Sequence, residues 1–322
     1  MEKIAVLLNP SAGKGKSLKR KSKVEHSLRS AGIPYDLFVS GSEEHLRRLA
    51  RQSVDDYGMV VGVGGDTTFK IIAGEILKNG SRSRSKPMSI LGMVGAGSAN
   101  DIARGLGVLE VESLCEAIRA GVTRDMDVGC LRDNGREEPL WFFGSLSAGL
   151  GTTVNRYIET FCLKHPRLAK FSLSGQVLPG VLAVSRSFSR GLVPMEAELE
   201  YGGTTRRIIF SLLVFSNIPF YANGLAFHPA ISPFDGRLDA VVIHTDSFRQ
   251  TLKFAYRLGR GNHRQEKAFE MISSPAFRLT CPQPFDIQAD GDIITGLQSL
   301  EVSLLPGALK VFSTVKRGQA EF

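Results

Sequence analysis

Short apolar runs alternate with longer, more polar segments through the first third of the chain. The apolar runs lie at 4–8, 35–39, 59–63 and 89–93. Segments of helical character run over 16–31, 43–52, 67–77 and 102–106. Regular alternation of strands and helices is typical of βαβ units. The pattern therefore predicts an α/β domain built on a parallel sheet.

The pattern changes after Asp127. Strand-like runs at 140–147, 195–201, 207–216 and 238–244 are linked by turns rather than by regular helices. Gly202-Gly203 between two of them is a hairpin signal. Helical segments are expected at 152–160, 168–188 and 247–258, and the last strands at 300–305 and 309–312. We therefore predict a second domain that is mainly antiparallel, with some helices.

Glycine-rich segments follow three of the N-terminal strands. They are 9–15 after the first strand, 64–68 after the third and 95–101 after the fourth. Ligands of such sheets bind beyond the carboxyl ends of the strands, so the three loops should converge on one crevice. Glycines let the backbone approach a phosphate, and a helix N-terminus favours an anion. The P-loop spacing is absent, and each loop alone is also consistent with an ordinary turn.

Asp66 follows the two glycines at 64–65. A carboxylate beside a phosphate site is repulsive unless it binds a metal ion or accepts a proton. This combination suggests phosphoryl transfer.

Composition narrows the choice of partner and compartment. The 322 residues are 43% hydrophobic and carry a net charge of +8, so one large or two moderate domains are expected. The positive charge favours a nucleotide or an anionic membrane surface. Nucleic acid is disfavoured because no binding motif is present. The cysteines form no CxxC pair, which favours a reducing, cytoplasmic setting. No apolar run reaches the roughly 18–20 residues of a membrane span.

Six motifs follow one another along the chain. They are Asn-Pro-Ser-Ala-Gly at 9–13, Gly-Gly-Asp-Thr-Thr at 64–68, Gly-Ser-Ala-Asn-Asp-Ile-Ala-Arg at 97–104, Met-Asp-Val-Gly at 126–129, Asp-Gly-Arg-Leu-Asp at 235–239 and Asp-Gly-Asp at 290–292. Together they resemble the diacylglycerol kinase catalytic family, which includes bacterial soluble lipid kinases and sphingosine and ceramide kinases. The resemblance covers almost the whole chain.

The resemblance implies two domains. Residues 1–127, joined by the tail at about 306–322, would form an α/β nucleotide-binding domain similar to those of NAD kinase and phosphofructokinase. Residues 128–305 would form a β-sandwich-like domain for the lipid. The resemblance also implies ATP and Mg²⁺ as cofactors. It implies a cytoplasmic protein that associates peripherally with the membrane to reach a lipid substrate. A homodimer is left open.

The resemblance also assigns roles to residues. Those expected around the nucleotide are Asn9, Pro10, Ser11, Ala12, Gly13, Ser40, Gly64, Gly65, Asp66, Thr67, Thr68, Gly97, Ser98 and Asn100. Asp66, Asp101 and Asp127 are expected in a carboxylate–water–magnesium network. Asp235, with the backbone carbonyls of Ser232 and Arg237, is expected to hold a structural metal. Asp292 stands at the position of the general base, and Asp290 and Asp66 complete the expected catalytic set.

Four positions depart from the family pattern. Thr67 replaces a glycine, Lys70-Ile71 replaces Asn-Glu, Gly95 replaces a proline, and Asp292 replaces a glutamate. Three hypotheses therefore stay open: an active lipid kinase with a divergent site, a nucleotide-binding protein with weak or lost catalysis, and a kinase that acts on a soluble substrate, as NAD kinase does.

Two further regions allow more than one interpretation. The apolar segment 168–188 either lines an acyl-chain channel or touches membrane, or belongs to the core. Two groups of basic residues, one in the helical segment 16–31 and one at 249–267, form either solvated faces or surfaces for anionic ligands. They are Lys16, Lys19, Arg20, Lys21 and Lys23, and Arg249, Arg257, Arg260, Arg264 and Lys267.

Overall fold

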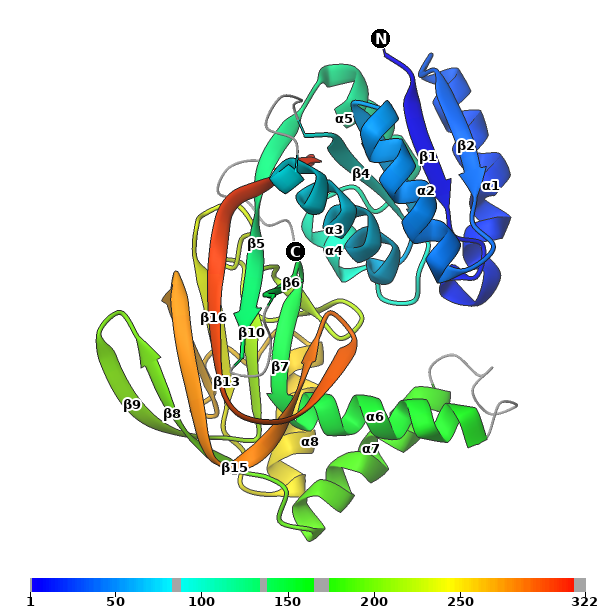
Figure 1. Cartoon of the computed structure of the whole chain (residues 1–322). Helices are drawn as coiled ribbons and strands as arrows, with labels where there is room; N and C mark the ends of the chain where they lie inside the picture. The colour runs from blue at the N-terminus through cyan, green and yellow to red at the C-terminus, as the bar shows by residue number, and fades with distance from the viewer. Residues whose placement is uncertain (1, 83–87, 134–137, 165–173, 316–322) are drawn as a thin grey trace.

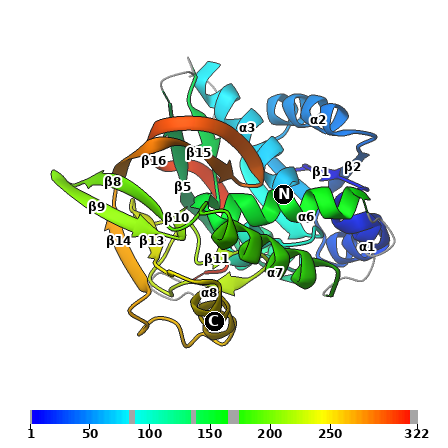
Figure 2. The same ribbon diagram turned by 90° about the horizontal axis from the view of Figure 1, so that it is seen from below.

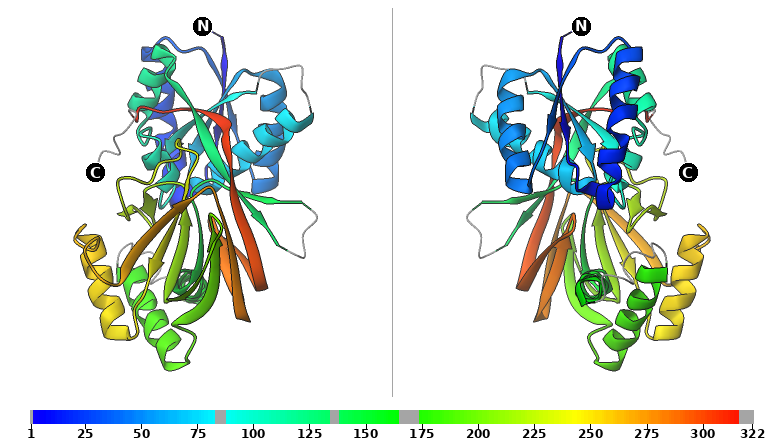
Figure 3. Two further views of the ribbon diagram at one scale, coloured as in Figure 1. Left: turned by 90° about the vertical axis from the view of Figure 1, so that its left-hand side faces the viewer. Right: turned by 90° about the vertical axis from the view of Figure 1, so that its right-hand side faces the viewer.

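Four parallel strands form the N-terminal part of the sheet. The computed structural model describes residues 2–82, 88–133, 138–164 and 174–315. The strands are β1 (Ile4–Leu8), β2 (Tyr35–Val39), β3 (Met59–Gly64) and β4 (Ile90–Gly95), in the spatial order β4-β3-β1-β2. The helices are α1 (Ala12–Ser30), α2 (Glu43–Asp56), α3 (Asp66–Arg82), α4 (Asp101–Gly105) and α5 (Val111–Ala120). Helices lie on both faces of these strands (Figure 3), which confirms the predicted α/β arrangement.

The rest of the chain is antiparallel and rich in strands. Its elements are β5 (Thr123–Arg132), β6 (Leu140–Phe142), β7 (Ser145–Gly149), α6 (Leu150–Lys164), α7 (Ser174–Ser189), β8 (Met195–Tyr201), β9 (Thr204–Phe210), β10 (Leu212–Ser216), β11 (Phe220–Tyr221), β12 (Leu225–Ala226), β13 (Leu238–Ile243), α8 (Phe248–Gly259), β14 (Phe269–Ser274) and β15 (Ala276–Ala289). Pairing runs β7-β10-β13-β14 on one side and β15 to β7, β8 and β16 on the other. Helices α6, α7 and α8 lie together beside these strands (Figure 2).

One long strand joins the two parts. β16 (Asp292–Phe312) pairs antiparallel with β15 and β5, and near its end Val311 pairs in parallel with Leu91 of β4. In Figure 1, β5 and β16 run side by side from the β-rich part to the α/β part. The end of β16 therefore returns to the N-terminal sheet. Residues 316–322 of the expected tail lie outside the described residues.

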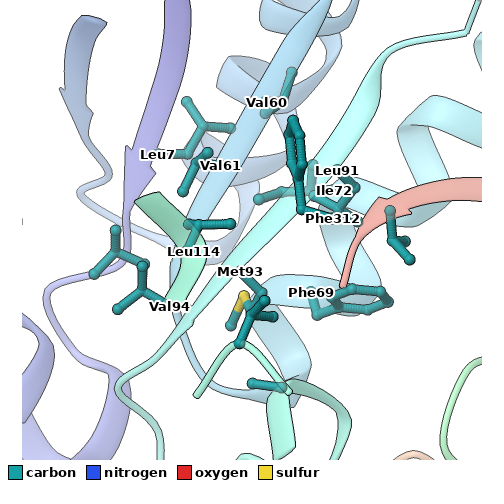
Figure 4. Packing of buried hydrophobic residues seen from close by; sticks show 14 of the residues in the cluster. Leu7, Val60, Val61, Phe69, Ile72, Leu91, Met93, Val94, Leu114 and Phe312 are labelled. Atoms are coloured by element: carbon teal, nitrogen blue, oxygen red, sulfur yellow. The ribbon is translucent and has the colours of Figure 1, made fainter. Parts of the chain in front are cut away.

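Apolar side chains from distant segments fill the core of the α/β part. Figure 4 shows Val61, Leu91 and Leu114 packed around Phe312 from the end of β16. All four are buried. The apolar residues of the β-rich part form separate clusters between its strands and against α8. Because Phe312 belongs to the N-terminal cluster, the end of β16 is part of that core.

Several predicted boundaries were wrong. The run 207–216 is two strands, because Ser211 breaks it: the buried Ser211 hydroxyl donates to the carbonyl of Ile243, and its own carbonyl accepts from Leu150. The run 140–147 likewise divides into β6 and β7, and 300–305 and 309–312 belong to one strand with an irregularity between Leu305 and Leu309. Helix α3 extends to Arg82, and α5 was not predicted. Residues 168–173 of the predicted apolar helix lie outside the described part.

Within the described ranges, no helix is both long and apolar enough to span a membrane.

Candidate active site

Three glycine-rich loops meet at the carboxyl edge of the parallel sheet. They follow β1, β3 and β4, and their backbones touch. A Cβ atom added to Gly13 would lie 2.4 Å from the carbonyl oxygen of Ala96. A Cβ added to Gly97 would lie 2.4 Å from the Cα of Gly65. Because other residues carry a Cβ, only glycine permits these approaches. The structure thus brings together the three loops that the sequence predicted to converge.

The first loop passes through three left-handed residues before the regular part of α1. The φ angles of Gly13, Lys14 and Gly15 are 61°, 58° and 86°. Asn9 fixes the start of this loop: its Oδ1 accepts from the Ser11 hydroxyl at 2.8 Å, and its Nδ2 donates to Oγ1 of Thr68 at 3.1 Å. Backbone turns of this kind ahead of a helix present N–H groups to anions. The loop has the form of a phosphate cradle.

Thr67 lies in the first turn of α3 and causes no backbone strain. It is exposed, and its φ is not positive. The replacement of the family's glycine therefore leaves an ordinary helical backbone, which a β-branched residue can adopt. Gly64 is the position that needs a glycine, because an added Cβ would lie 2.2 Å from Oγ1 of the buried Thr68.

Asp66 and Asp101 are both held by backbone N–H groups. The two oxygens of Asp66 accept from Asp101 at 3.2 Å and Ile102 at 3.1 Å, which ties α3 to the start of α4. The carboxylate of Asp101 accepts from Asn223 at 3.0 Å and Gly224 at 2.7 Å. Burial, then repulsion from Asp101, raises the pKa of Asp66 to about 6. Burial also raises the pKa of Asp101.

The Asp290 carboxylate accepts three hydrogen bonds from backbone N–H groups at the turn between β6 and β7. The donors are Phe143 at 2.6 Å, Gly144 at 2.9 Å and Ser145 at 3.0 Å. Burial raises the pKa of Asp290, against the opposite effect of these N–H groups. Its charge also contributes to raising the pKa of Asp66. We call Asp66, Asp101 and Asp290 the acid cluster.

Asp292 begins β16, immediately after the turn that contains Asp290. The residues between the paired positions Ala289 and Asp292 have φ angles of 44° (Asp290) and 97° (Gly291), as in a type I′ hairpin turn. The Asp292 carboxylate pairs with Lys70 of α3, with 2.5 Å between Nζ and Oδ2. The structure therefore places the expected general base beside one of the residues that depart from the family pattern.

A second set of carboxylates lies at Asp127, Asp235 and Asp239. The oxygens of the buried Asp127 accept from the N–H groups of Gly236 at 2.7 Å and Gly307 at 2.8 Å. Burial raises the pKa of Asp235, and the charge of Asp127 adds to this rise. Burial raises the pKa of Asp239 to about 6. Within the described residues, the hydrogen bonds of the Asp127 carboxylate run to this region and not to the acid cluster.

The two expected carbonyl ligands flank Asp235. The Arg237 N–H donates to Oδ1 of Asp235 at 3.0 Å, and the Arg237 side chain bonds Ser273, which fixes one side of the loop. Ser232 lies before Pro233, whose carbonyl accepts from the Asp127 N–H at 2.8 Å. The loop at 232–237 is thus bonded to both the backbone N–H and the side-chain carboxylate of Asp127.

The remaining predicted nucleotide residues lie in or beside the three loops. Pro10 and Ala12 are partly buried in the first loop. The buried Ser40 donates through its backbone N–H to the carbonyl of Leu8 at 2.9 Å. Ser98 is exposed, and Asn100 closes its loop by accepting from the Gly97 N–H at 2.6 Å.

Sequence reasoning missed two contributors to the site. The 222–224 turn supplies the N–H donors to Asp101, and all three of its residues have positive φ. The Asn-Gly dipeptide at 223–224 is the turn signal in the sequence that could have located it. Arg104 lies over the Phe220 ring at 5.6 Å, and its buried Nε has no acceptor among the described residues. Its charge opposes the rise in the pKa of Asp101.

The acid cluster fits a magnesium ion only in part. Over the described ranges, no group of three or more acidic, histidine or cysteine side chains is arranged to hold a metal by itself. Mg²⁺ usually binds one or two carboxylates together with substrate phosphates and water. Asp66 and Asp101 supply hard oxygen ligands. Burial raises the pKa values of both, and repulsion from Asp101 adds to the rise for Asp66, so a bound cation would favour the charged form of each carboxylate.

Part of the predicted basic surfaces is neutralised. On α1, Arg20 and Lys23 pair with Glu110, at 3.5 Å and 3.4 Å. Arg257 of α8 pairs with Glu266, and Arg260, just after α8, lies over the ring of Tyr256. Some of these basic residues therefore make contacts within the protein rather than presenting free charge to a ligand.

Comparison with known proteins agrees with this architecture. Residues 3–131 match the diacylglycerol kinase catalytic domain, and residues 144–313 match the YegS C-terminal NAD kinase beta sandwich-like domain. A Bacillus subtilis (strain 168) protein named "Putative lipid kinase YtlR" is 23% identical over 95% of this chain and 97% of its own length. The "Diacylglycerol kinase" of the same organism is 22% identical over 91% and 90%.

A solved structure gives the same fold. It is described as a "putative diacylglycerol kinase" from Bacillus anthracis str. Sterne, and it superimposes with a TM-score of 0.72 at 17% identity over 97% of this chain and 95% of that one. The two matched domains cover nearly the whole chain, in the order that the motifs suggested. The chain therefore belongs to the diacylglycerol kinase family of lipid kinases, with a YegS-type C-terminal domain.

Proposed function

We propose that the protein is an ATP- and Mg²⁺-dependent lipid kinase that transfers the γ-phosphoryl group to a lipid hydroxyl of the diacylglycerol or sphingoid and ceramide type. The observation that carries this proposal is the meeting of three glycine-rich loops with the acid cluster. Asp66 belongs to both, since it follows Gly65 and lies beside Asp101 and Asp290.

The residues divide the chemistry among them. The loop N–H groups after β1, β3 and β4 bind the phosphates, while Asp66 and Asp101, with Asp127 through water, hold the ion. Bound Mg²⁺ supplies positive charge that offsets the charge of the phosphates. Asp292 accepts the proton of the lipid hydroxyl as its oxygen bonds the γ-phosphorus. The bond from that phosphorus to the bridging oxygen breaks, and ADP leaves with the electron pair.

We also propose that the two parts of the chain bind different substrates. Residues 1–127, with the tail at about 306–322, bind the nucleotide, and residues 128–305 bind the lipid. The return of β16 supports this division, because it connects the hairpin of Asp290 to the N-terminal sheet. Asp235, with the carbonyls of Ser232 and Arg237, is proposed to hold a structural metal that stiffens the β-rich part.

We propose that the protein is cytoplasmic and binds its lipid substrate peripherally, at the membrane surface. Exposed apolar side chains on α7 and α8 support this, among them Leu182, Leu252 and Tyr256. Exposed Arg249 and Lys253 on α8 add positive charge, which attracts anionic lipid. A pocket of about 400 Å³ beside α7 is lined by Tyr157, Leu182, Ser185, Arg186, Ser189 and Arg190. Its mainly polar lining suits a headgroup better than an acyl chain.

The test is transfer of label from γ-labelled ATP to a panel of acceptors in mixed micelles. The panel holds diacylglycerol, sphingosine, ceramide and a polyprenol, with NAD as a soluble acceptor. We expect label in a lipid, dependent on Mg²⁺. Label in NAD alone would indicate a kinase for a soluble substrate, and ATP binding without any transfer would indicate a protein that has lost catalysis.

Two variants test the assigned roles. Asp66→Asn should abolish transfer while the protein stays folded, and wild-type rates in that variant contradict the proposal. Asp292→Ala should lower turnover by roughly 10²- to 10⁴-fold with little change in ATP affinity, because it removes the proton acceptor. Unchanged turnover removes Asp292 from that role.

A further inference from the structure

Lys70 stands where the expected proton acceptor meets the nucleotide loops. It lies four residues after Asp66 in α3, so both side chains project from the same face of the helix. Its ammonium is 2.5 Å from Oδ2 of Asp292. Its charge also acts on Asp290. Lys70 is therefore a basic residue next to the acid cluster.

The exposure of the two partners is unequal. The Lys70 side chain is 16% exposed and that of Asp292 is 63% exposed. A side chain as exposed as Asp292 is free to sample several rotamers, whereas one as buried as Lys70 is held by its packing. Lys70 is thus the fixed partner of the ion pair, and it sets the orientation of the Asp292 carboxylate.

The pairing leaves one carboxylate oxygen for chemistry. Among the described residues, Lys70 is the one side chain that pairs with Asp292, and it does so through Oδ2. Oδ1 stays available for the proton of a substrate hydroxyl. A proton acceptor must be held within hydrogen-bond reach of that hydroxyl, and a displacement of about 1 Å can cost about 100-fold in rate.

We propose that Lys70 is a positioning residue that holds the Asp292 carboxylate with Oδ1 toward the lipid hydroxyl. This inference rests on the proposed function and deepens it. Lys70 acts through Asp292, so its removal affects turnover and leaves ATP affinity alone. The proton that leaves the hydroxyl ends on Oδ1 of Asp292 and is not transferred to Lys70.

The test is a double-mutant cycle on the full-length protein, with labelled ATP and a diacylglycerol, ceramide or sphingosine acceptor. Lys70→Met should lower kcat by about 10- to 100-fold, while the ATP dissociation constant measured by calorimetry changes less than about twofold. Lys70→Arg should recover kcat to within about threefold, because it keeps the charge and donors. In an Asp292→Asn background, Lys70→Met should cause no further loss.

Lys78→Met is the matched control, because Lys78 lies on the same helix about 12 Å further along and pairs with Glu75 instead. It should keep the wild-type kcat. If Lys70→Met does not fold, Lys70→Gln takes its place in the cycle. A wild-type kcat in the Lys70 variant, losses that multiply with Asp292→Asn, or a tenfold weaker ATP affinity overturns the inference. A wild type that labels no lipid overturns the proposed function itself, and this inference with it.

Discussion

Gly97 packs against Gly65 so closely that a side chain on either residue would meet the backbone of the other. A Cβ on Gly97 would lie 2.4 Å from the Cα of Gly65, and a Cβ on Gly65 would lie 2.9 Å from the Cα of Gly97. The loops after β3 and β4 are held at this separation. We expect Gly97→Ala to cost about 1–3 kcal/mol in the free energy of unfolding, because the loops must move apart.

The same variant should weaken ATP binding, because the separated loops present their N–H groups at the wrong spacing. Denaturant unfolding and calorimetry measure the two effects. Gly74→Ala is the control: Gly74 lies within α3, and an added Cβ there meets nothing within 4 Å. It should be neutral or stabilising, by up to about 1 kcal/mol. Equal effects of the two substitutions would show that the contact between the loops is unimportant.

Asp290 should prove essential for stability as well as for activity. Its carboxylate binds the N–H groups of Phe143, Gly144 and Ser145. Asp290→Ala leaves these donors without a partner, and we expect a loss of about 3 kcal/mol or more in the free energy of unfolding. Asp290→Asn should lose less, because its amide oxygen still accepts and asparagine tolerates the positive φ of this position.

Urea unfolding monitored by fluorescence of the single tryptophan, Trp141, measures these differences. If Asp290→Ala is as stable as the wild type but inactive, Asp290 takes part in the chemistry directly and the anchoring role is wrong.

Asp66 should make the metal-free protein more stable at mildly acidic pH. Burial and the neighbouring Asp101 raise its pKa to about 6 in the folded state, compared with about 3.9 in an unfolded chain. The folded protein therefore holds this proton more tightly. The contribution to stability is fully present below about pH 4 and is lost as the pH rises through about 6.

We expect the Tm in the presence of a chelator to rise as the pH is lowered from about 8 to about 5, and Asp66→Asn to reduce this rise. Asp239, whose pKa is also raised to about 6, contributes with the same sign, so Asp239→Asn serves as the comparison. Added Mg²⁺ with ATP should raise the Tm of the wild type at about pH 8 by more than it raises the Tm of Asp66→Asn. A full pH dependence in Asp66→Asn contradicts the assignment.

Asp127 should hold the point where β16 crosses into the α/β part. It accepts from Gly236 and from Gly307, which lies in the irregularity of β16 between Leu305 and Leu309. Asp127→Ala leaves two N–H groups unpaired and should cost about 2–4 kcal/mol. Asp125→Ala on the same strand removes only an exposed carboxylate 4.0 Å from Lys310. That control should change stability by no more than about 0.5 kcal/mol in chemical unfolding.

The predicted strands agree best where an apolar run is bounded by turn residues. β1, β2 and β8 have the bounds that the sequence predicted, and the Gly202-Gly203 hairpin is present with both glycines at positive φ. The continuous run at 207–216 was misleading, because Ser211 interrupts it through a bond to Ile243, on a strand far along the chain. Thr67 departs from the family's glycine, yet the helical backbone at this position suits a threonine.

The sequence alone determined the alternation of strands and helices, the glycine loops at the strand ends, and the family motifs. These depend on local patterns, which the printed residues contain. Tertiary structure decided which distant side chains meet. Lys70 and Asp292 are separated by 222 positions, and Phe143 and Asp290 by 147. Both contacts exist because β15 pairs with β7 and the long β16 returns to the N-terminal sheet, and no local pattern specifies that path.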